Sequence, residues 1–354
     1  MPKAIGYAAR SATTPLTTFH FDRRALRPED VQIDILYCGV CHSDLHQTRN
    51  DWKGTMYPCC PGHEIVGRVS KTGPAVRKFR EGDRVAVGCL VDSCLACDQC
   101  RKGEEQLCRN RSTGTYNGKD RITGETTYGG YSDIIVVREE FVLRIPDALD
   151  IKRAAPLLCA GITTYSPLKK WNVGPGSRVG VAGLGGLGHM AVKLAVGLGA
   201  DVTVITGSPA KEADAKALGA QKVLITTDKD ALRAATSSFD VIIDTVPVAH
   251  PVTPYLHLLD IDGTLVIVGA IDQLPPFHTG LLLGQRRRVT GSPIGGIAET
   301  QEMLDFCAAK NILPDCEMID IQEINHAYER MEKSDVKYRF VIDMASLGKE
   351  AKAA

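Results

Sequence analysis

The chain has 354 residues, enough to bury a substantial core and, at ordinary domain sizes, to form two domains. Lys+Arg and Asp+Glu are equal at 42 each, so no whole-protein field attracts nucleic acid or an anionic membrane. No apolar stretch approaches the roughly 20 residues that span a bilayer, and the start lacks the layout of a signal peptide. We therefore expect a cytoplasmic protein that acts on small molecules.

The first part of the chain shows strand patterns and few helical ones. In residues 31–38 apolar side chains alternate with Gln32 and Asp34, which is the period of a half-buried strand. Similar short runs, bounded by Gly, Pro or charged turns, follow. The pattern predicts an irregular, mostly β first domain, with further strands at residues 63–69, 83–87, 132–137 and 141–145.

After about Arg153 the pattern of apolar residues changes, because short apolar runs are now separated by helical segments. This arrangement predicts a parallel α/β sheet. The sequence indicates both ends of the helix that follows the strand at 201–206. Ser208 can cap its start, Pro209 suits its first turn and Gly219 can end it. The predicted strands lie at residues 178–182, 201–206, 222–225, 239–243 and 263–268.

Twelve cysteines in a chain without a secretory signal favour metal ligation over disulfides. Four of them follow the pattern C-x2-C-x2-C-x7-C, in which four thiolates can surround one ion as a tetrahedron. The group has no water-bearing position, so we predict a closed, structural zinc site. Four unrelated thiols and an iron–sulfur cluster are the alternatives, although the last gap differs from that of a ferredoxin. The four ligands are Cys94, Cys97, Cys100 and Cys108.

Three further candidate ligands, Cys41, His63 and Cys159, are scattered along the chain. Two thiolates and an imidazole leave zinc a fourth position for water or substrate, which is the arrangement for Lewis-acid catalysis. Spacing alone does not connect them, and judged alone Cys159 is interpreted as a core thiol. The remaining cysteines are interpreted as buried free thiols: Cys38, Cys59, Cys60, Cys89, Cys307 and Cys316.

A glycine-rich segment, GLGGLG at residues 183–188, follows the predicted strand 178–182 and precedes a predicted helix from about His189. Between strand and helix, glycines allow a tight turn, the approach of a pyrophosphate to backbone amides, and close helix packing. The segment therefore predicts a dinucleotide site, with an ordinary glycine-rich turn as the alternative. The predicted contacts are Gly183, Gly185, Gly186, Leu187 and Gly188.

The end of the second predicted strand of this sheet indicates which dinucleotide is bound. An NAD site places Asp or Glu there to bind the ribose hydroxyls, but this chain has no carboxylate at that point. Thr206 and Ser208 can donate hydrogen bonds to a 2′-phosphate, Lys211 adds a positive charge, and the next helix presents its N-terminal amides. We predict NADP(H); the alternative is that these residues only end the strand and cap the helix.

The runs GVCHSDLH at residues 39–46 and PGHE at 61–64, with the four-cysteine lobe and Cys159, resemble the zinc-containing medium-chain dehydrogenases. Within them the chain looks most like the cinnamyl alcohol dehydrogenase branch and its bacterial broad-range aldehyde reductases. The similarity covers essentially the whole chain. It implies an α/β protein with three parts: a GroES-like, mostly β catalytic domain at 1–152, a doubly wound Rossmann domain at 153–290, and a segment at 291–354 that returns to the first domain.

The resemblance implies a catalytic zinc on Cys41, His63 and Cys159, and hence two zinc ions per chain. Glu64 would be an exchange ligand for that zinc, and Asp44 matches the acid that orients the histidine. The implied reaction is hydride transfer between NADP(H) and a broad range of aldehydes or primary alcohols, mainly in the direction of aldehyde reduction.

The same resemblance implies a proton relay from solvent through His46 and the nicotinamide ribose to Ser43, although judged alone the two residues are a surface histidine and a turn residue. It also implies a homodimer that pairs the cofactor-domain sheets near residues 263–270. Plant members that act on lignin precursors have an aromatic where this chain has Pro293, which argues against cinnamyl specificity. Further implied cofactor contacts are His42, Thr163, Val268 and Ile294, and the implied substrate residues are Trp52, Met56 and Pro293.

Two other functions are weighed against this one. A zinc-free enone or quinone reductase would share the fold and bind NADPH, but those relatives lack the cysteine lobe. A non-enzymatic, redox-responsive binding protein would use the cysteines alone. The joint presence of Cys41, His63, Glu64, Ser43 and Cys159 argues against the loss of catalysis.

Overall fold

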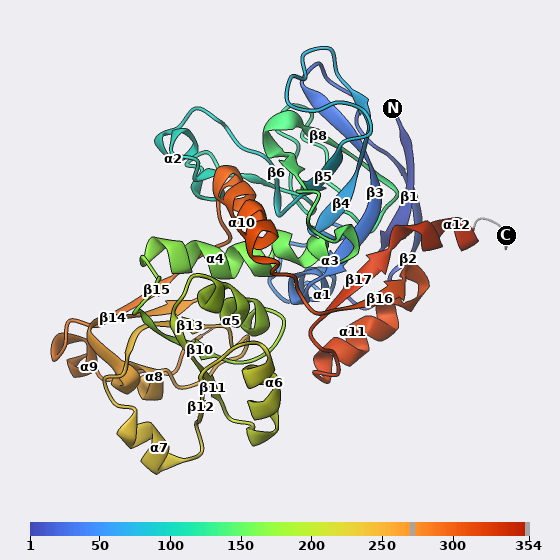
Figure 1. Ribbon diagram of the computed structural model, residues 1–354. Helices are drawn as coiled ribbons and strands as arrows, with labels where there is room; N and C mark the ends of the chain where they lie inside the picture. Colours follow the sequence, from blue (N-terminus) through green and yellow to red (C-terminus); the bar gives the residue numbers. More distant parts are fainter. Residues whose placement is uncertain (270–272, 351–354) are drawn as a thin grey trace. The chain divides into compact units, whose positions relative to one another are not determined.

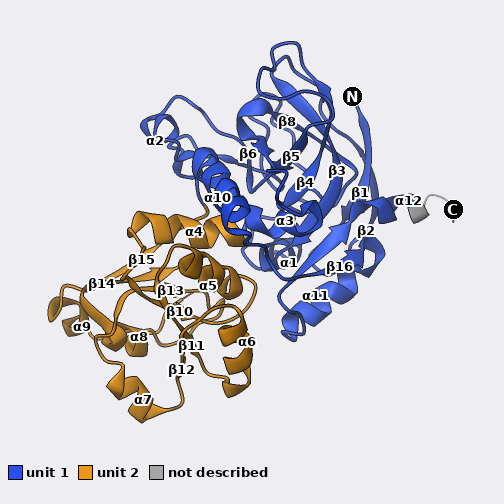
Figure 2. Cartoon of the chain, viewed as in Figure 1, with its two compact units in different colours: residues 1–159, 295–354 blue, residues 160–294 orange. Residues whose placement is uncertain are grey.

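The computed structural model describes residues 1–269 and 273–350, and the chain divides into two compact units (Figures 1 and 2). Unit 1 comprises Met1–Cys159 and Gly295–Ala354, and unit 2 comprises Ala160–Ile294. The two crossings between units fall a few residues later than the boundaries expected after residues 152 and 290. Cys159 is therefore the last residue of the first segment of unit 1.

Unit 1 is built on a seven-stranded, largely antiparallel sheet in the order β16-β17-β3-β4-β5-β9, with β8 paired to β3. Two small antiparallel pairs, β1-β2 and β6-β7, complete its strands. The strands are β1 (Lys3–Ala8), β2 (Thr17–Asp22), β3 (Asp30–Val40), β4 (Ile65–Thr72), β5 (Arg84–Val87), β6 (Leu90–Asp92), β7 (Thr113–Gly114), β8 (Ile134–Arg138), β9 (Leu143–Arg144), β16 (Cys316–Asp320) and β17 (Arg339–Asp343).

The helices of unit 1 are short, apart from two in its C-terminal segment. These two longer helices are α10 and α11. The α-helices are α1 (His42–Thr48), α2 (Asp98–Arg101), α3 (Ile151–Ala154), α10 (Ile297–Lys310), α11 (Ile324–Glu332) and α12 (Leu347–Glu350). The 3-10 turns are η1 (Glu105–Leu107), η2 (Glu139–Phe141), η3 (Ala155–Leu158), η5 (Ile321–Glu323) and η6 (Met344–Ser346).

Strand β3 is the centre of this sheet and differs from its sequence pattern. Asp34 is exposed as alternation requires, but Gln32 is buried, and its amide donates to Ser70 Oγ at 3.2 Å. The strand pairs with β4 along one edge and with both β8 and β17 along the other, which satisfies its backbone hydrogen bonds. Its side chains are mostly buried on both faces, unlike those of a half-buried strand. Its last residues lead directly into Cys41 and α1.

Unit 2 contains a six-stranded, wholly parallel sheet in the order β12-β11-β10-β13-β14-β15. This is the doubly wound order, in which ligands bind beyond the carboxyl ends of the two strands where the winding reverses, here β10 and β13. The predicted parallel sheet is confirmed. The strands are β10 (Arg178–Ala182), β11 (Asp201–Thr206), β12 (Lys222–Ile225), β13 (Phe239–Asp244), β14 (Leu259–Ile267) and β15 (Arg288–Gly291).

The helices of unit 2 connect these strands. The segment after β11 was expected to begin with a capping Ser208, but the Ser208 side chain makes no capping hydrogen bond, and the segment begins as a 3-10 turn. Gly219 does close it, with a positive φ of 103° that favours glycine. The elements are α4 (Ala160–Lys170), α5 (Gly188–Gly197), η4 (Pro209–Lys211), α6 (Glu212–Ala217), α7 (Lys229–Ala234), α8 (Thr253–Leu258) and α9 (Gly280–Leu283).

Candidate metal and cofactor sites

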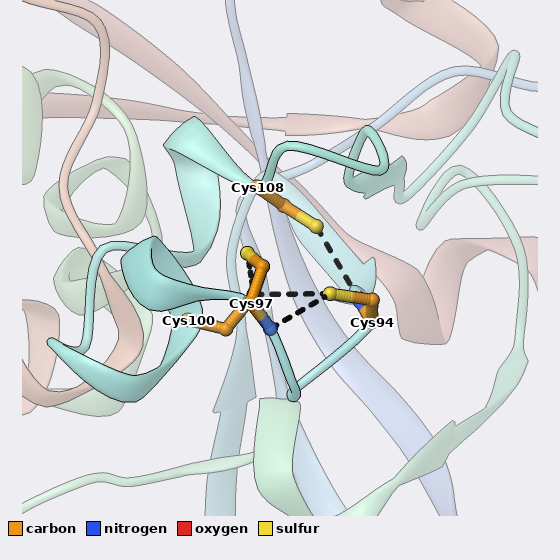
Figure 3. A group of neighbouring side chains, drawn as sticks. All are labelled: Cys94, Cys97, Cys100 and Cys108. Carbon is orange, nitrogen blue, oxygen red and sulfur yellow. Dashed lines mark hydrogen bonds between the residues drawn. The ribbon is translucent and has the colours of Figure 1, made fainter.

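The four cysteines of the C-x2-C-x2-C-x7-C pattern lie together in the loop around α2 and η1 (Figure 3). Their sulfurs all lie within 4.8 Å of one another, with Cys97 Sγ 3.5 Å and Cys94 Sγ 3.9 Å from Cys100 Sγ. Four sulfurs at the usual zinc–sulfur distance of about 2.3 Å are about 3.8 Å apart in a tetrahedron. The group therefore fits one zinc ion with no other ligand.

Backbone amides surround these sulfurs. The Cys94 amide donates to Cys108 Sγ at 3.5 Å, and the Cys97 amide donates to Cys94 Sγ at 3.3 Å. The pKa of Cys94 is lowered to about 5, chiefly because the Ala96 amide donates to it, with Asn110 and the Cys97 amide adding to the effect. The lobe thus favours the thiolate form at Cys94, which is the form that binds metal.

A second group, formed by Cys41, His63, Glu64 and Cys159, lies inside unit 1. One ligand atom of each lies within 4.8 Å of the others, all four residues are buried, and Cys41 Sγ is 3.9 Å from Cys159 Sγ. They come from the start of α1, the segment before β4 and the end of η3. The fold therefore brings together the three predicted ligands that spacing could not connect, and the set of donors suits a zinc ion with one exchangeable position.

Helix α1 positions Cys41 because Cys41 is its N-cap residue. Asp44, in the first turn, accepts a hydrogen bond from the Cys41 amide at 2.9 Å and closes the capping box. The same carboxylate accepts from Nδ1 of His63 at 3.0 Å. A proton held on Nδ1 leaves Nε2 as the ligand atom, so Asp44 has the geometry expected of the acid that orients the histidine.

The charges around this group favour thiolate at one sulfur. The pKa of Cys41 lies well below its usual value, because Cys159 donates a hydrogen bond to it and because Arg339 and His63 add positive charge, although burial opposes the shift. Contacts with Cys41 and Cys89 raise the pKa of Cys159. One cation would remove the conflict between the two buried sulfurs, since it would stabilise both as thiolates.

Glu64 supplies a further sign of a cation. Its side chain is fully buried, and its Oε1 is paired with Arg339. Its Oε2 has no hydrogen-bond partner among the described residues, which is costly for a buried carboxylate oxygen. A Cβ at residue 39 would stand 1.9 Å from this Oε2, so Gly39 leaves the space that the carboxylate occupies.

Ser43 and His46, the predicted relay, lie three positions apart on α1 and are both half-buried, so they are neighbours on one helix surface. Nδ1 of His46 lies 2.8 Å from Oδ2 of Asp51, and the Trp52 ring lies 5.5 Å from the imidazole. Sequence reasoning missed Asp51. Neither composition nor motif singled it out, because the turn after α1 is what brings it back to the helix.

In unit 2 the glycine-rich segment lies between β10 and α5, as predicted. Gly183 has a φ of 87°, and a Cβ there would meet Thr245 Oγ1 at 2.9 Å. A Cβ on Gly188 would stand 2.3 Å from the Gly183 carbonyl oxygen, so the turn requires glycine at both places. A Cβ on Gly185 would meet nothing within 4 Å, which leaves open space for a pyrophosphate at this backbone.

The end of β11 carries the residues predicted to bind the 2′-phosphate. Thr206 is buried, and its Oγ1 accepts a hydrogen bond from the Ser208 amide at 3.2 Å. Lys211 extends back to the glycine-rich segment, where its Nζ donates to the Leu184 carbonyl at 2.9 Å. The lysine charge therefore lies beside the predicted dinucleotide site, although α6 contains acidic residues further on.

The other implied contacts are spread over both units. In unit 1, His42 is exposed on α1, and Met56 is half-buried, with its amide donating to Asn117 Oδ1 at 2.8 Å. In unit 2, Thr163 is buried in α4, Val268 and Ile294 are half-buried, and Pro293 is exposed. Their roles stay predictions.

The six cysteines interpreted as free thiols divide into two groups. Four are buried: Cys38, Cys59, Cys60 and Cys307. Cys89 and Cys316 are only half-buried. Cys89 is the less expected of these, since its Sγ lies 3.7 Å from the Leu158 carbonyl, directly beside Cys159.

Comparison with known families agrees with this geometry. The profile of the alcohol dehydrogenase GroES-like domain matches residues 27–147, and that of the zinc-binding dehydrogenases matches residues 186–309. The chain therefore belongs to the zinc-binding dehydrogenases that carry an alcohol dehydrogenase GroES-like domain, and it is an oxidoreductase. The predicted family, fold class and enzyme class are confirmed.

Particular relatives extend over almost the whole chain. NADP-dependent alcohol dehydrogenase C 1 of Mycolicibacterium smegmatis is 53% identical over 98% of this chain and 99% of its own length. Aldehyde reductase YahK of Escherichia coli is 52% identical over 98% of this chain and 99% of its own length. The crystal structure of CAD from Helicobacter pylori complexed with NADP(H) is 42% identical, with a TM-score of 0.91 over 97% of this chain and 98% of its own.

Proposed function

We propose that this protein reduces a broad range of aldehydes with NADPH and catalyses the reverse oxidation of primary alcohols. The buried group of Cys41, His63, Glu64 and Cys159 is the observation that carries the proposal, because its donors fit a catalytic zinc. Zinc held by these residues would supply a Lewis acid for the substrate oxygen, and NADP(H) held by unit 2 would supply or accept the hydride.

We infer that the residues around the metal group fix its chemistry before substrate arrives. Asp44 sets the tautomer and the orientation of His63. Arg339 compensates the buried charge of Glu64, while Oε2 of Glu64 remains available to exchange with a ligand. The surroundings are pre-organised, so little reorganisation is needed when charge develops on the substrate oxygen.

The proton that completes the reduction is proposed to pass along α1. Asp51 holds Nδ1 of His46 at 2.8 Å, which leaves Nε2 free to exchange protons. His46 is half-buried and accessible to water, while Ser43 can accept and donate at once. Asp51 is thus assigned to orient His46, and Ser43 to contact the substrate oxygen.

The preference for NADP(H) is proposed to come from the end of β11. Thr206 offers no negative charge, and Lys211 lies against the glycine-rich segment. A 2′-phosphate dianion would meet a cation and hydroxyl donors there instead of a carboxylate. The NADP dependence of alcohol dehydrogenase C 1 of Mycolicibacterium smegmatis and the cofactor of the Helicobacter pylori structure support this proposal.

On the side of unit 1, the substrate pocket is proposed to include Trp52 and Met56. Trp52 is 47% exposed although it is a large aromatic residue, and it lies beside His46. An exposed aromatic next to the proposed relay suits contact with a range of aliphatic and aromatic groups. We do not assign a cinnamyl aldehyde as the particular substrate, because residue 293 is a proline.

A cytoplasmic homodimer is proposed for the assembly. Strand β15 forms one edge of the sheet of unit 2. Leu283, at the end of α9, and Ile261, on the neighbouring strand β14, are 79% and 61% exposed. An unpaired edge with exposed apolar side chains suits pairing with a second copy. The expected pairing region at 263–270 includes Ala270, which lies outside the described residues. Among the described residues, no helix has the length and apolar character to cross a membrane.

A substrate panel with both cofactors tests the function directly. Benzaldehyde, an aliphatic aldehyde and an enone are each supplied with NADPH and with NADH. We expect oxidation of NADPH with both aldehydes and little with the enone. Rapid reduction of the enone carbon–carbon double bond without aldehyde turnover would favour the reductase alternative, and inactivity with every pair would favour the binding protein.

A further inference from the structure

Asp44 is fully buried, and its carboxylate is shared by four donors in unit 1. Oδ1 accepts from Nδ1 of His63 and from the Gly62 amide, each at 3.0 Å. Oδ2 accepts from the Cys41 amide at 2.9 Å and faces the hydroxyl of Tyr131 at 3.4 Å. Three of the donors belong to Cys41 and His63, which are two of the three proposed ligands, and to Gly62, which precedes His63. Tyr131 comes from a distant segment of the sequence.

Tyr131 also contacts the segment that carries His63. Its backbone amide donates to the Pro61 carbonyl at 3.0 Å, and the Gly130 amide donates to the Gly62 carbonyl at 2.8 Å. The Tyr131 ring occupies the space beside Gly62, because a Cβ on Gly62 would stand 2.7 Å from Tyr131 Cδ1. Gly62 has a φ of 100°, so the chain turns sharply against this ring just before His63.

The hydroxyl of Tyr131 is suited to remain a donor. The residue is 0% exposed, and burial, with Asp44 and Tyr328 nearby, raises the pKa of its phenol well above the usual value. Both effects favour the protonated phenol, which can donate a hydrogen bond to the Asp44 carboxylate, and a hydrogen bond to a charged acceptor is stronger than one to a neutral acceptor. Nothing in the proposed reaction uses this residue.

We propose that Tyr131 is a positioning residue for the metal group: its hydroxyl holds Asp44 and its ring holds the turn at Gly62, so that together they fix His63 for zinc. The proposal rests on the proposed catalytic zinc site. A residue that hydrogen-bonds to a metal ligand orients that ligand, and replacing such a residue lowers the affinity for the metal. Asp44 contacts the ligand His63, and Tyr131 in turn contacts Asp44.

The test measures zinc release from the intact, zinc-loaded protein with a chromogenic chelator, because the four-cysteine site serves as an internal standard. The wild type should hold two zinc ions, and Cys159→Ser should hold one, which identifies the phase that belongs to the catalytic site. Tyr131→Phe removes the hydroxyl alone, and Tyr131→Leu removes the ring as well. Phe141→Leu, which removes another fully buried ring of unit 1, is the matched control.

We expect Tyr131→Phe to accelerate the catalytic-site phase measurably and Tyr131→Leu to accelerate it by about tenfold or more, with the other phase unchanged. Phe141→Leu should not change the ratio of the two phases. Equal rates for wild type and both Tyr131 variants would overturn the proposal, as would equal acceleration of both phases, which indicates general loosening. A wild type that holds a single zinc ion would contradict the proposed function and this inference with it.

Discussion

Arg339 and Glu64 form an ion pair across 275 residues of sequence, with side chains that are 5% and 0% exposed. Burial raises the pKa of Glu64 to about 7, and Arg339 opposes that shift. A buried charge that loses its partner is not resolvated by water. The pair therefore connects β17, near the end of the chain, to the metal group that follows β3.

Replacing Arg339 by Ala should destabilise unit 1 by about 3–5 kcal/mol, because it leaves Glu64 unpaired in the interior. The chain has two tryptophans, so urea unfolding in a Trp171→Phe background reports on Trp52 and hence on unit 1. Arg49→Ala is the matched control, since Arg49 and Glu332 are 40% and 44% exposed and should contribute within about 1 kcal/mol. Equal effects of the two variants would contradict this account of the buried pair.

His46→Ala should slow turnover by about 100-fold while zinc content stays normal, because in the proposed mechanism the residue moves a proton and binds no metal. Asp51→Asn should have a smaller effect, since it weakens the orientation of His46 without removing the imidazole. Steady-state rates and elemental analysis of the same preparations measure both. Loss of zinc from His46→Ala would mean that the histidine is misassigned.

Thr206→Asp should move cofactor preference toward NAD by about tenfold or more in kcat/KM, because a carboxylate at the end of β11 repels a 2′-phosphate. Gly207→Asp tests the neighbouring, exposed position in the same way. The ratio of kcat/KM for NADPH and NADH is the measurement, and Thr206→Ser is the neutral control. An unchanged ratio in both aspartate variants would refute the assignment of this strand end.

Cys97→Ser should remove the zinc of the four-cysteine lobe and leave the other zinc in place, so that zinc content falls from about two to about one per chain. The loop depends on the metal, and the variant should lose at least about 2 kcal/mol of stability. Elemental analysis and limited proteolysis around residues 94–108 check this. A variant that keeps both zinc ions and full protease resistance would contradict a closed four-thiolate site.

The sequence was most informative where local pattern and structure coincide. The strands at 178–182, 201–206 and 222–225 appear with the expected bounds, because buried parallel strands are continuous apolar runs with clear breaks. In unit 1 the first two strands and helix α1 were not predicted. α1 has only seven residues, too few to display a helical period, and its start depends on the Cys41 and Asp44 capping box.

The three parts of the site differ in how far the sequence predicted them. The four-cysteine lobe follows from spacing alone, because its ligands are close in sequence. The grouping of Cys41, His63 and Cys159 required family resemblance, since strands β3 and β4 and turn η3 bring them together only in the fold. Arg339, Asp51 and Tyr131 were missed as site residues, because each acts through a contact that no local pattern records.

The central claim is that Cys41, His63 and Cys159 hold a zinc ion that aldehyde reduction requires. The most direct test is the zinc content and the NADPH-dependent reduction of benzaldehyde measured on one preparation of Cys159→Ser beside wild type. We predict about two zinc ions per wild-type chain and about one in the variant, with a rate more than about 100-fold lower. A variant that has lost this zinc and still reduces benzaldehyde at the wild-type rate would contradict the account.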